Sequence, residues 1–314
     1  MRHVGMATHA VQGHESLTDL GSDYLQVFRC NDIAGGMVNR EANYSVLMSV
    51  YAKDSPLFLD SAIESMANQT VKFNDMVIVC DGKLSAGLDG ILEKWQKELG
   101  KRLTVLRYEE NRGLGSALAV GLPHCRCNIV ARMDADDLSR DTRCELLLNE
   151  MLDKDLDIVG GFIEEFDEKP GDLGVVRTVP LTQEGIERFA KRRSPFNHVS
   201  IMYKKDMVER VGSYEPFFHM EDYWLWVRMI LAKAKCENIE SVVVDVRVGS
   251  GMYARRSNAE FRKSQRDFFI RLYRIGFITR YECVRNTFER TIISLLPEKQ
   301  VRNVYNRFLR RQVT

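Results

Sequence analysis

The chain has 314 residues, of which 45% are hydrophobic and 28% charged, a composition typical of a globular enzyme. No apolar run approaches the ~18 residues of a membrane-spanning helix, and the opening residues MRHVGMATHAVQGHESL lack the basic and apolar regions of a signal peptide. We therefore expect a cytoplasmic protein. Residues 255–314 carry a net charge of +10 and the preceding residues −9, so the near-zero total hides a basic tail that predicts an anionic partner surface.

The seven cysteines are odd in number and scattered along the chain. Cys125 and Cys127 are separated by one residue, whereas zinc ligands of a knuckle usually have two or more residues between them. We expect free thiols in a reducing compartment.

The first half of the chain alternates apolar runs with helical patterns. Residues 1–42 show no clear period and form an extension of unknown role. Ser55-Pro56 is typical of a helix start, and further helical patterns cover residues 88–99 and 115–121. Strands are predicted at Val46–Val50, Met76–Cys80, Leu103–Arg107 and Asn128–Met133. This alternation predicts an α/β fold, with a mostly parallel central sheet flanked by helices and ligands bound at the carboxyl ends of its strands.

The second half is less regular. We expect strands at Asp157–Phe162, Val199–Tyr203 and Ser241–Val248, and a helix at Met220–Ala232. After Arg255 the chain becomes basic, aromatic-rich and helical in pattern, which sets residues 259–314 apart from a catalytic domain at 43–258.

The sharpest chemical feature is the segment Met133-Asp134-Ala135-Asp136-Asp137, which directly follows a predicted strand. Three carboxylates so close together repel one another, and a divalent cation bridging to a pyrophosphate would neutralise them. Hard oxygen ligands suit Mg²⁺ or Mn²⁺. An acidic turn that caps the following helix is the alternative.

Two further turns follow strands on the same side. Asp81-Gly82 suits a hydrogen bond to a base or ribose with close backbone approach, or it is a simple Asp-Gly turn. The segment Asn111-Arg112-Gly113-Leu114-Gly115 either steadies a nucleotide or only forms the turn. It lacks the third glycine of the dinucleotide-binding fingerprint.

Glu221-Asp222 lies among aromatic residues and suits proton abstraction, with stacking faces for a sugar. An acidic first turn stabilised by the helix dipole is the alternative, and both can hold together. His198 is either a structural residue or a contact to a metal or phosphate. Arg255-Arg256 follows Gly249-Ser250-Gly251 and suits a pyrophosphate clamp, with a solvated basic pair as the alternative.

Taken together, these residues resemble the family 2 glycosyltransferases, which adopt the GT-A fold. The resemblance covers roughly Tyr44 to Asn258. Within this family, the chain is similar in particular to bacterial exopolysaccharide and O-antigen enzymes of the amylovoran type. The ordered motifs that carry it are YSVLMSVY, VIVCDG, NRGLG, ARMDADD, SPFNHVSIM, EDYWLWVRM and MYARRS.

The resemblance implies a role for each matching residue. Ser49 and Tyr51 would border uracil and ribose, Asp81 would bond the base, and Asp134 would lie near the ribose and metal. Asp136 would ligate Mn²⁺ or Mg²⁺. Asp222 would be the general base, supported by Glu221. His198, Arg255 and Arg256 would lie near the diphosphate, with Arg112 at the nucleotide. Cys80 departs from the pattern, since many members have an aspartate there.

The implied activity is inverting, metal-dependent transfer of glucose or galactose from a UDP-sugar to a lipid-linked saccharide acceptor, carried on polyprenyl diphosphate. No nucleic acid is expected as a partner. A nucleotidyltransferase is the first alternative, but it usually needs a Gly/Arg-rich loop after the first strand, which Tyr51-Ala52-Lys53-Asp54 does not provide. A non-catalytic sugar-nucleotide-binding protein is the second.

The tail is predicted to hold the enzyme on the inner face of the cytoplasmic membrane, because aromatic and aliphatic residues among arginines are typical of an interfacial helix. The alternative is that the apolar residues pack on the catalytic domain. The residues concerned are Phe268, Phe269, Leu272, Tyr273, Ile275, Phe277 and Ile278, interleaved with Arg266, Arg271, Arg274 and Arg280.

Overall fold

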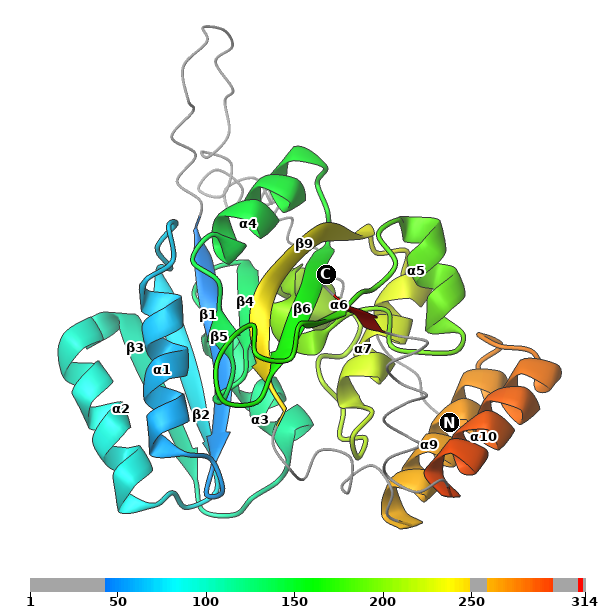
Figure 1. Cartoon of the computed structure of the whole chain (residues 1–314), viewed down its shortest axis with the longest axis horizontal. Helices are drawn as coiled ribbons and strands as arrows, with labels where there is room; N and C mark the ends of the chain where they lie inside the picture. Colours follow the sequence, from blue (N-terminus) through cyan, green and yellow to red (C-terminus); the bar gives the residue numbers. More distant parts are fainter. Residues whose placement is uncertain (1–42, 249–258, 296–309, 313–314) are drawn as a thin grey trace, which may run out of the picture. The chain divides into compact units, whose positions relative to one another are not determined.

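The computed structural model describes residues 43–248, 259–295 and 310–312. The predicted extension at 1–42 and the arginine pair at 255–256 lie outside these ranges. Within them, strands and helices alternate through the first half, as the sequence predicts (Figure 1). The elements of this half are β1 (Tyr44–Tyr51), α1 (Pro56–Ala67), β2 (Asp75–Asp81), α2 (Ala86–Leu99), β3 (Leu103–Tyr108), α3 (Leu114–Gly121) and β4 (Ile129–Met133).

The second half adds short strands and helices that the sequence patterns only partly indicate. The segment predicted as a strand at Val199–Tyr203 divides into a 3₁₀ turn at His198–Ser200 and a short strand. Its elements are β5 (Leu138–Ser139), α4 (Arg143–Asp153), β6 (Ile158–Phe166), β7 (Val175–Arg177), α5 (Gln183–Ala190), β8 (Met202–Lys204), α6 (Lys205–Arg210), α7 (Glu221–Leu231) and β9 (Cys236–Arg247). The tail contributes α9 (Ala259–Arg274), α10 (Arg280–Leu295) and β10 (Arg310–Gln312).

The strands form one sheet with two kinds of pairing. On one side β3, β2, β1 and β4 are parallel in that order. Beyond β4, strands β8, β6, β7 and β10 each pair antiparallel with the preceding one, while β9 runs parallel to β6. The α/β sheet flanked by helices is confirmed, and it is mixed, because β4 joins a parallel half to a largely antiparallel one.

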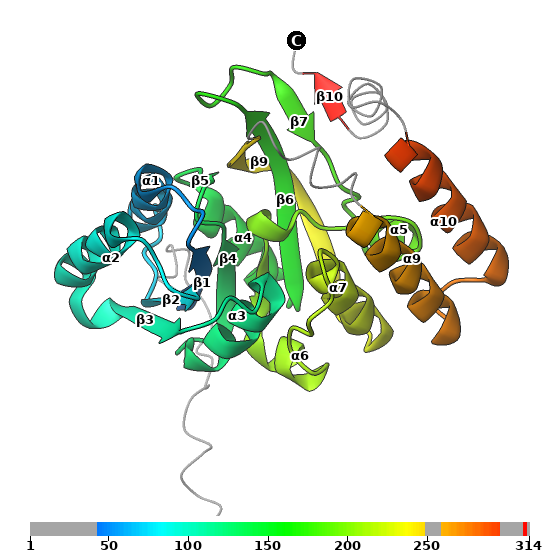
Figure 2. The same cartoon turned by 90° about the horizontal axis from the view of Figure 1, so that it is seen from below.

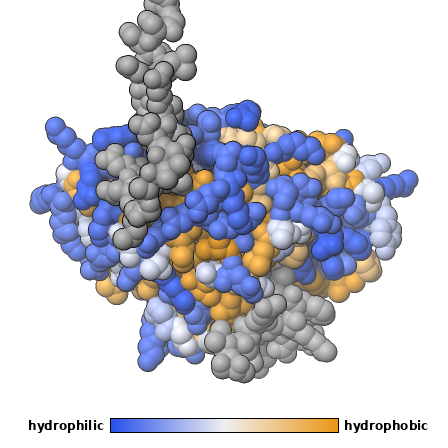
Figure 3. All heavy atoms as spheres, turned by 90° about the horizontal axis from the view of Figure 1, so that it is seen from above, coloured by the Kyte–Doolittle hydropathy of each residue, from blue (hydrophilic) through white to orange (hydrophobic). Residues whose placement is uncertain are grey.

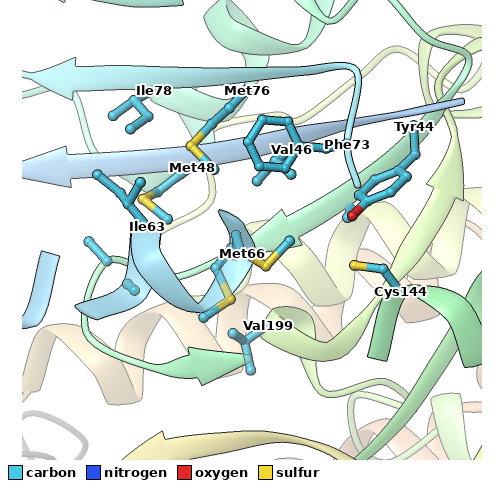
Figure 4. Close-up of a cluster of buried hydrophobic side chains, with 14 of the residues drawn as sticks. Tyr44, Val46, Met48, Ile63, Met66, Phe73, Met76, Ile78, Cys144 and Val199 are labelled. Carbon is cyan, nitrogen blue, oxygen red and sulfur yellow. The ribbon is translucent and has the colours of Figure 1, made fainter. Parts of the chain in front are cut away.

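Both faces of the sheet are buried. Along β1, Val46 and Met48 pack with α1, α2 and α4, whereas Leu47 faces α3, α6 and α7. Figure 4 shows the first of these layers, where Ile63 and Met66 of α1 meet side chains of β1 and β2. Strands covered on both faces read as continuous apolar runs, which is why the sequence identifies them.

The tail is helical as predicted, but its apolar residues do not all face outward. Phe268, Phe269 and Leu272 of α9 are at most 2% exposed and pack with Tyr223 and Trp224 of α7. Ile278 is buried in the same cluster. Their predicted contact with a membrane is therefore wrong, because the adjacent α7 offers an apolar face that they cover.

The described surface carries several large exposed apolar side chains. On the face seen from above, apolar side chains gather toward the middle with hydrophilic ones around them (Figure 3). α10 exposes Tyr281, Val284, Phe288 and Ile292. Within the described ranges, no helix combines the length and the apolar character required to cross a membrane.

Candidate active site

The predicted site residues gather at one edge of the parallel half. In the strand register, Tyr51 lies opposite Asp81, and Asp81 opposite Tyr108. Met48 of β1 lies opposite Met133, the last residue of β4, so Ser49 and Asp134 each follow directly after this pair. Figure 2 views the molecule from this edge. The strand ends thus bring together the residues that the sequence places after separate strands.

Asp81 organises the turn that follows β3. Its carboxylate accepts hydrogen bonds from the backbone N–H groups of Arg112 (2.7 Å) and Gly113 (2.9 Å) and from the Tyr108 hydroxyl (2.8 Å). Gly82 has a φ of +89°, and a Cβ there would lie 2.9 Å from the backbone nitrogen of Asn111. The Asp-Gly turn is therefore hydrogen-bonded to the Asn-Arg-Gly turn, which supports a structural role for both. A contact of either turn with a nucleotide stays a prediction.

The exposed side chain of Arg112 lies on the outside of this turn. Its guanidinium stacks on the ring of Tyr108, with 5.1 Å between the guanidinium carbon and the ring centroid. The positively charged guanidinium of Arg112 is therefore held at the carboxyl edge of the sheet, beside Asp81.

The carboxylates of Asp134, Asp136 and Asp137 converge beyond β4. One oxygen from each lies within 4.8 Å of the others. Asp136 is exposed, whereas Asp137 is buried and accepts a hydrogen bond from the backbone N–H of Arg247 at 2.8 Å. Burial, followed by the charges of Asp134 and Asp136, raises the pKa of Asp137 well above its usual value. This set of hard oxygen ligands fits a divalent cation.

A buried arginine lies beneath the aspartates. Arg132 is 1% exposed, and its guanidinium forms an ion pair with Asp134. Burial by itself would lower the pKa of Arg132, but the carboxylate of Asp134 outweighs that effect and keeps the side chain charged. Arg132 therefore supplies positive charge to the aspartate cluster from within the protein, which the sequence patterns did not indicate.

Asp54 is a fourth acidic residue at this edge. Its carboxylate accepts the backbone N–H of Tyr51 at 2.9 Å. Burial raises the pKa of Asp54 to about 7, and the charges of Asp136 and Asp134 contribute to the rise. Sequence reasoning missed this residue because an Asp before Ser55-Pro56 looks like part of a helix start.

Arg247, at the end of β9, closes the site from the second half. Besides its backbone bond to Asp137, its guanidinium lies 3.8 Å from the ring centroid of Phe58 and 4.5 Å from that of Phe166. The sequence showed only a valine-rich strand here and gave no sign of this contact.

The acidic pair Glu221-Asp222 begins α7. Burial, and then the charge of Asp222, raises the pKa of Glu221 to about 7. Burial also raises the pKa of Asp222, against the opposing effects of the backbone N–H of Tyr223 and the charges of Arg132 and Arg177. Arg132 is thus an electrostatic neighbour of both the aspartate cluster and the acidic pair. Carboxylates with a raised pKa bind a proton more readily, so this pair is suited to accept one.

The acidic pair also lies next to the turn that Asp81 holds. A Cβ added at Gly115, in the first turn of α3, would lie 3.0 Å from the Cβ of Glu221. The first turns of α3 and α7 are therefore in contact. This contact connects the Asn-Arg-Gly turn, which Asp81 holds, to the candidate base.

His198 begins the 3₁₀ turn before β8 and packs against Tyr214 and Trp226. Its Nε2 lies 3.1 Å from the hydroxyl of Tyr214, and its ring meets Trp226 edge-on with 5.7 Å between centroids. Burial, and then the charge of Arg132, lowers the pKa of His198 well below its usual value, so the ring is neutral. A neutral ring bonded to a tyrosine supports the structural alternative, and a role toward phosphate stays a prediction.

Comparison with known proteins identifies the family. The family model described as glycosyl transferase family 2 matches residues 45–217. A UDP-Gal:α-D-GlcNAc-diphosphoundecaprenol β-1,3-galactosyltransferase of Escherichia coli is 35% identical over 269 residues, covering 85% of this chain and 97% of its own. The amylovoran biosynthesis glycosyltransferase AmsE of Erwinia amylovora is 34% identical over 274 residues, covering 84% and 98%.

Solved structures support the fold. S. aureus TarS 1–349 in complex with UDP-GlcNAc aligns with a TM-score of 0.59 at 17% identity, covering 74% of this chain and 66% of that one. The mannosyltransferase PcManGT from Pyrobaculum calidifontis, in complex with GDP-Man and Mn²⁺, aligns with a TM-score of 0.56 at 17% identity, covering 83% and 78%. The GT-A fold is therefore confirmed, and the extent of the sequence match shows that the chain belongs to glycosyl transferase family 2.

Proposed function

We propose that this glycosyltransferase moves glucose or galactose from a UDP-sugar to a saccharide on polyprenyl diphosphate, with inversion, during surface polysaccharide biosynthesis. The observation that supports this most is that the charge of Arg132 acts on two acidic groups, the aspartates after β4 and the pair at the start of α7. The first suits a diphosphate with its cation and the second suits an acceptor hydroxyl. The Escherichia coli relative is named for a UDP-Gal donor and a diphosphoundecaprenol-linked acceptor.

The donor would lie along the carboxyl edge of the parallel half. Ser49 and Tyr51 would border the uridine, and Arg112 offers an exposed guanidinium. The Asp81 carboxylate already accepts three hydrogen bonds, yet a carboxylate has about four lone-pair positions. Asp81 would therefore reach the uracil ring N–H with its remaining capacity, while mainly holding the turn that carries Arg112.

Asp136 and Asp134 would hold Mn²⁺ or Mg²⁺, with Asp137 fixed behind them by Arg247. When bound, such a cation neutralises charge on the departing diphosphate. Arg132 orients Asp134 and thereby limits how far its carboxylate moves. His198, Arg255 and Arg256 would lie near the diphosphate, and the two arginines fall outside the described residues.

Asp222 would take the proton from the acceptor hydroxyl as that oxygen attacks the anomeric carbon. Glu221 would support this role as the adjoining carboxyl group, whose pKa burial and the charge of Asp222 raise to about 7. A single displacement inverts the anomeric centre, so an α-linked donor gives a β-linkage. A polyprenyl acceptor resides in a bilayer, so the enzyme would work peripherally at the inner face of the cytoplasmic membrane.

The test is a panel of UDP-sugars with Mn²⁺, Mg²⁺ or a chelator, and a lipid-diphosphate-linked GlcNAc or GalNAc acceptor, with products identified by mass and the new linkage by NMR. We expect metal-dependent addition of one hexose through a β-linkage. Nucleotidyl transfer, donor hydrolysis alone or an α-linkage would contradict the proposal.

The role of Asp222 is tested separately. We expect Asp222→Asn to lower kcat about 10²–10⁴-fold, because loss of a general base costs that much, while UDP affinity measured by calorimetry stays unchanged. Asp136→Asn is the contrasting variant, since it should lose metal-dependent donor binding as well. Parallel loss of UDP affinity and turnover in Asp222→Asn would point to a structural role.

A further inference from the structure

The outward side of α10 carries a row of apolar side chains that nothing in the catalytic site uses. Tyr281, Val284, Phe288 and Ile292 form this row, here named the α10 stripe, with exposed fractions of 73%, 63%, 65% and 44%. Their spacing of three, four and four residues places them on one side of the helix.

The opposite side of α10 is the one that packs on the protein. Cys283 and Asn286 are buried, and the side-chain amide of Asn286 donates to the backbone carbonyl of Lys191 at 2.8 Å. Arg192 of the same loop pairs with Glu289 at 2.7 Å. The helix is thus fixed in a rotation that directs its apolar stripe away from the body of the protein.

The charges around the stripe are mostly positive. Arg274 and Arg280 are exposed near the turn between α9 and α10, and the guanidinium of Arg285 lies over the ring of Tyr281. The two acidic residues of α10 have local partners, Glu289 with Arg192 and Glu282 with the N–H and hydroxyl of Thr279. The α10 stripe has one aromatic residue in each half, Tyr281 and Phe288, and arginines lie beside it. This composition suits the interface of a bilayer with anionic headgroups.

We propose that the α10 stripe inserts into an anionic lipid bilayer and that Arg274 and Arg280 contact its headgroups. This inference rests on the proposed lipid-linked acceptor for its purpose, although vesicle binding itself requires no substrate. The buried residues of α9 take no part, and their packing on α7 connects the docked helix to the helix that carries Asp222.

The test is sedimentation of the full chain with phosphatidylcholine vesicles, with and without phosphatidylglycerol, at low and high salt. We expect binding that requires phosphatidylglycerol and weakens with salt. Val284→Ser/Phe288→Ser should lower the partition coefficient about tenfold or more, because two large apolar side chains no longer insert. Arg274→Glu/Arg280→Glu should remove most of the salt-dependent part.

The matched control is Leu146→Ser/Leu152→Ser, which removes two exposed apolar side chains (40% and 38%) from α4 and should leave binding unchanged. Equal partitioning of the wild type and Val284→Ser/Phe288→Ser would overturn the proposal. So would a lipid-free dimer, seen by sedimentation velocity, that this double variant dissociates, because the stripe would then be an interface between copies.

Activity separates this inference from the proposed function. On a water-soluble, short-chain lipid-diphosphate acceptor, Val284→Ser/Phe288→Ser should match the wild type, whereas on the polyprenyl acceptor in vesicles its KM should rise about tenfold. Inactivity of every form on both acceptors, with vesicle binding intact, would refute the proposed function and leave the docking surface standing.

Discussion

At the scale of one residue, the pKa of Glu221 links the site to the stability of the fold. Its carboxyl has a folded-state pKa of about 7 against an ordinary value of 4.5. Because the folded protein binds the proton more tightly, the contribution of Glu221 to stability is fully present below about pH 4.5 and is lost as pH rises through 7. The ionised form of Glu221 therefore lowers the stability of the folded protein at neutral pH.

We expect Glu221→Gln, which mimics the protonated form, to be more stable than the wild type by about 2–3 kcal/mol at pH 8. The difference should shrink steadily toward pH 5. Urea unfolding of the metal-free protein at several pH values measures this. A gain that is the same at all pH values would show that packing, and not ionisation, is responsible.

We expect the charge of Arg132 to affect the protonation of the acidic pair. Because its charge opposes the rise in the pKa of Asp222, Arg132→Met should move the rising limb of the kcat/KM profile to higher pH. Arg132→Lys, which keeps the charge, should restore much of the wild-type position. A uniform loss of activity with an unshifted profile in both variants would mean that Arg132 only shapes the fold.

The sequence indicated some of these residues and not others, for physical reasons. The carboxylates after β4 can be recognised in the sequence because they directly follow the apolar run of a buried strand. Arg132 stands in the same strand, and an arginine within an otherwise apolar run next to aspartates is a signal that could have found it. Arg177 and Arg247 reach the site from distant elements, and only the folded sheet brings them there.

At the scale of elements, the contact between α3 and α7 makes a sharp prediction. A Cβ at Gly115 would lie 3.0 Å from the Cβ of Glu221 and 3.3 Å from the carbonyl oxygen of Glu215. Gly115→Ala should therefore displace the start of α7 by a few tenths of an ångström and lower kcat on the order of tenfold.

Gly90→Ala on α2 is the control for this variant. A Cβ there meets nothing within 4 Å, so activity should be unchanged and stability slightly higher, because alanine favours the helix. Comparison of kcat with the melting temperature of each variant distinguishes misplacement from unfolding. A Gly115→Ala enzyme with normal kcat would show that α7 tolerates the shift.

Element prediction succeeded where both faces of a strand are buried and weakened where polar residues are buried. α4 begins with Arg143, a residue type that patterns assign to the surface. Its side chain is fully buried and donates to the backbone carbonyl of Arg132 at 2.6 Å. In the tail, helical period was readable, but the partner of the apolar side depended on α7, which the local sequence does not reveal.

At the scale of the whole molecule, α9 packs on α7 through a hydrophobic cluster separate from the two that cover the sheet. It covers Tyr223 and Trp224 of α7, and Arg271 joins Glu215 at 3.0 Å in the loop before that helix. We expect a chain ending at residue 258 to be insoluble or unfolded. The truncation removes the buried side chains of Phe268, Phe269 and Leu272, and losing their burial costs roughly 5–9 kcal/mol, comparable to the stability of a domain.

Soluble yield and a thermal melt followed by circular dichroism measure this outcome. A truncated protein that melts cooperatively near the temperature of the full chain would show that residues 259–314 form an independent segment.

The position of β4 has a consequence for how such enzymes diversify. β4 pairs parallel with β1 on one side and antiparallel with β8 on the other, and the aspartates follow its end. On the proposed placement of the two substrates, substitutions in the parallel half would change the choice of nucleotide, and substitutions in the antiparallel half would change the choice of acceptor. The shared strand would meanwhile hold the aspartates in place, so the two specificities would be separable by mutation.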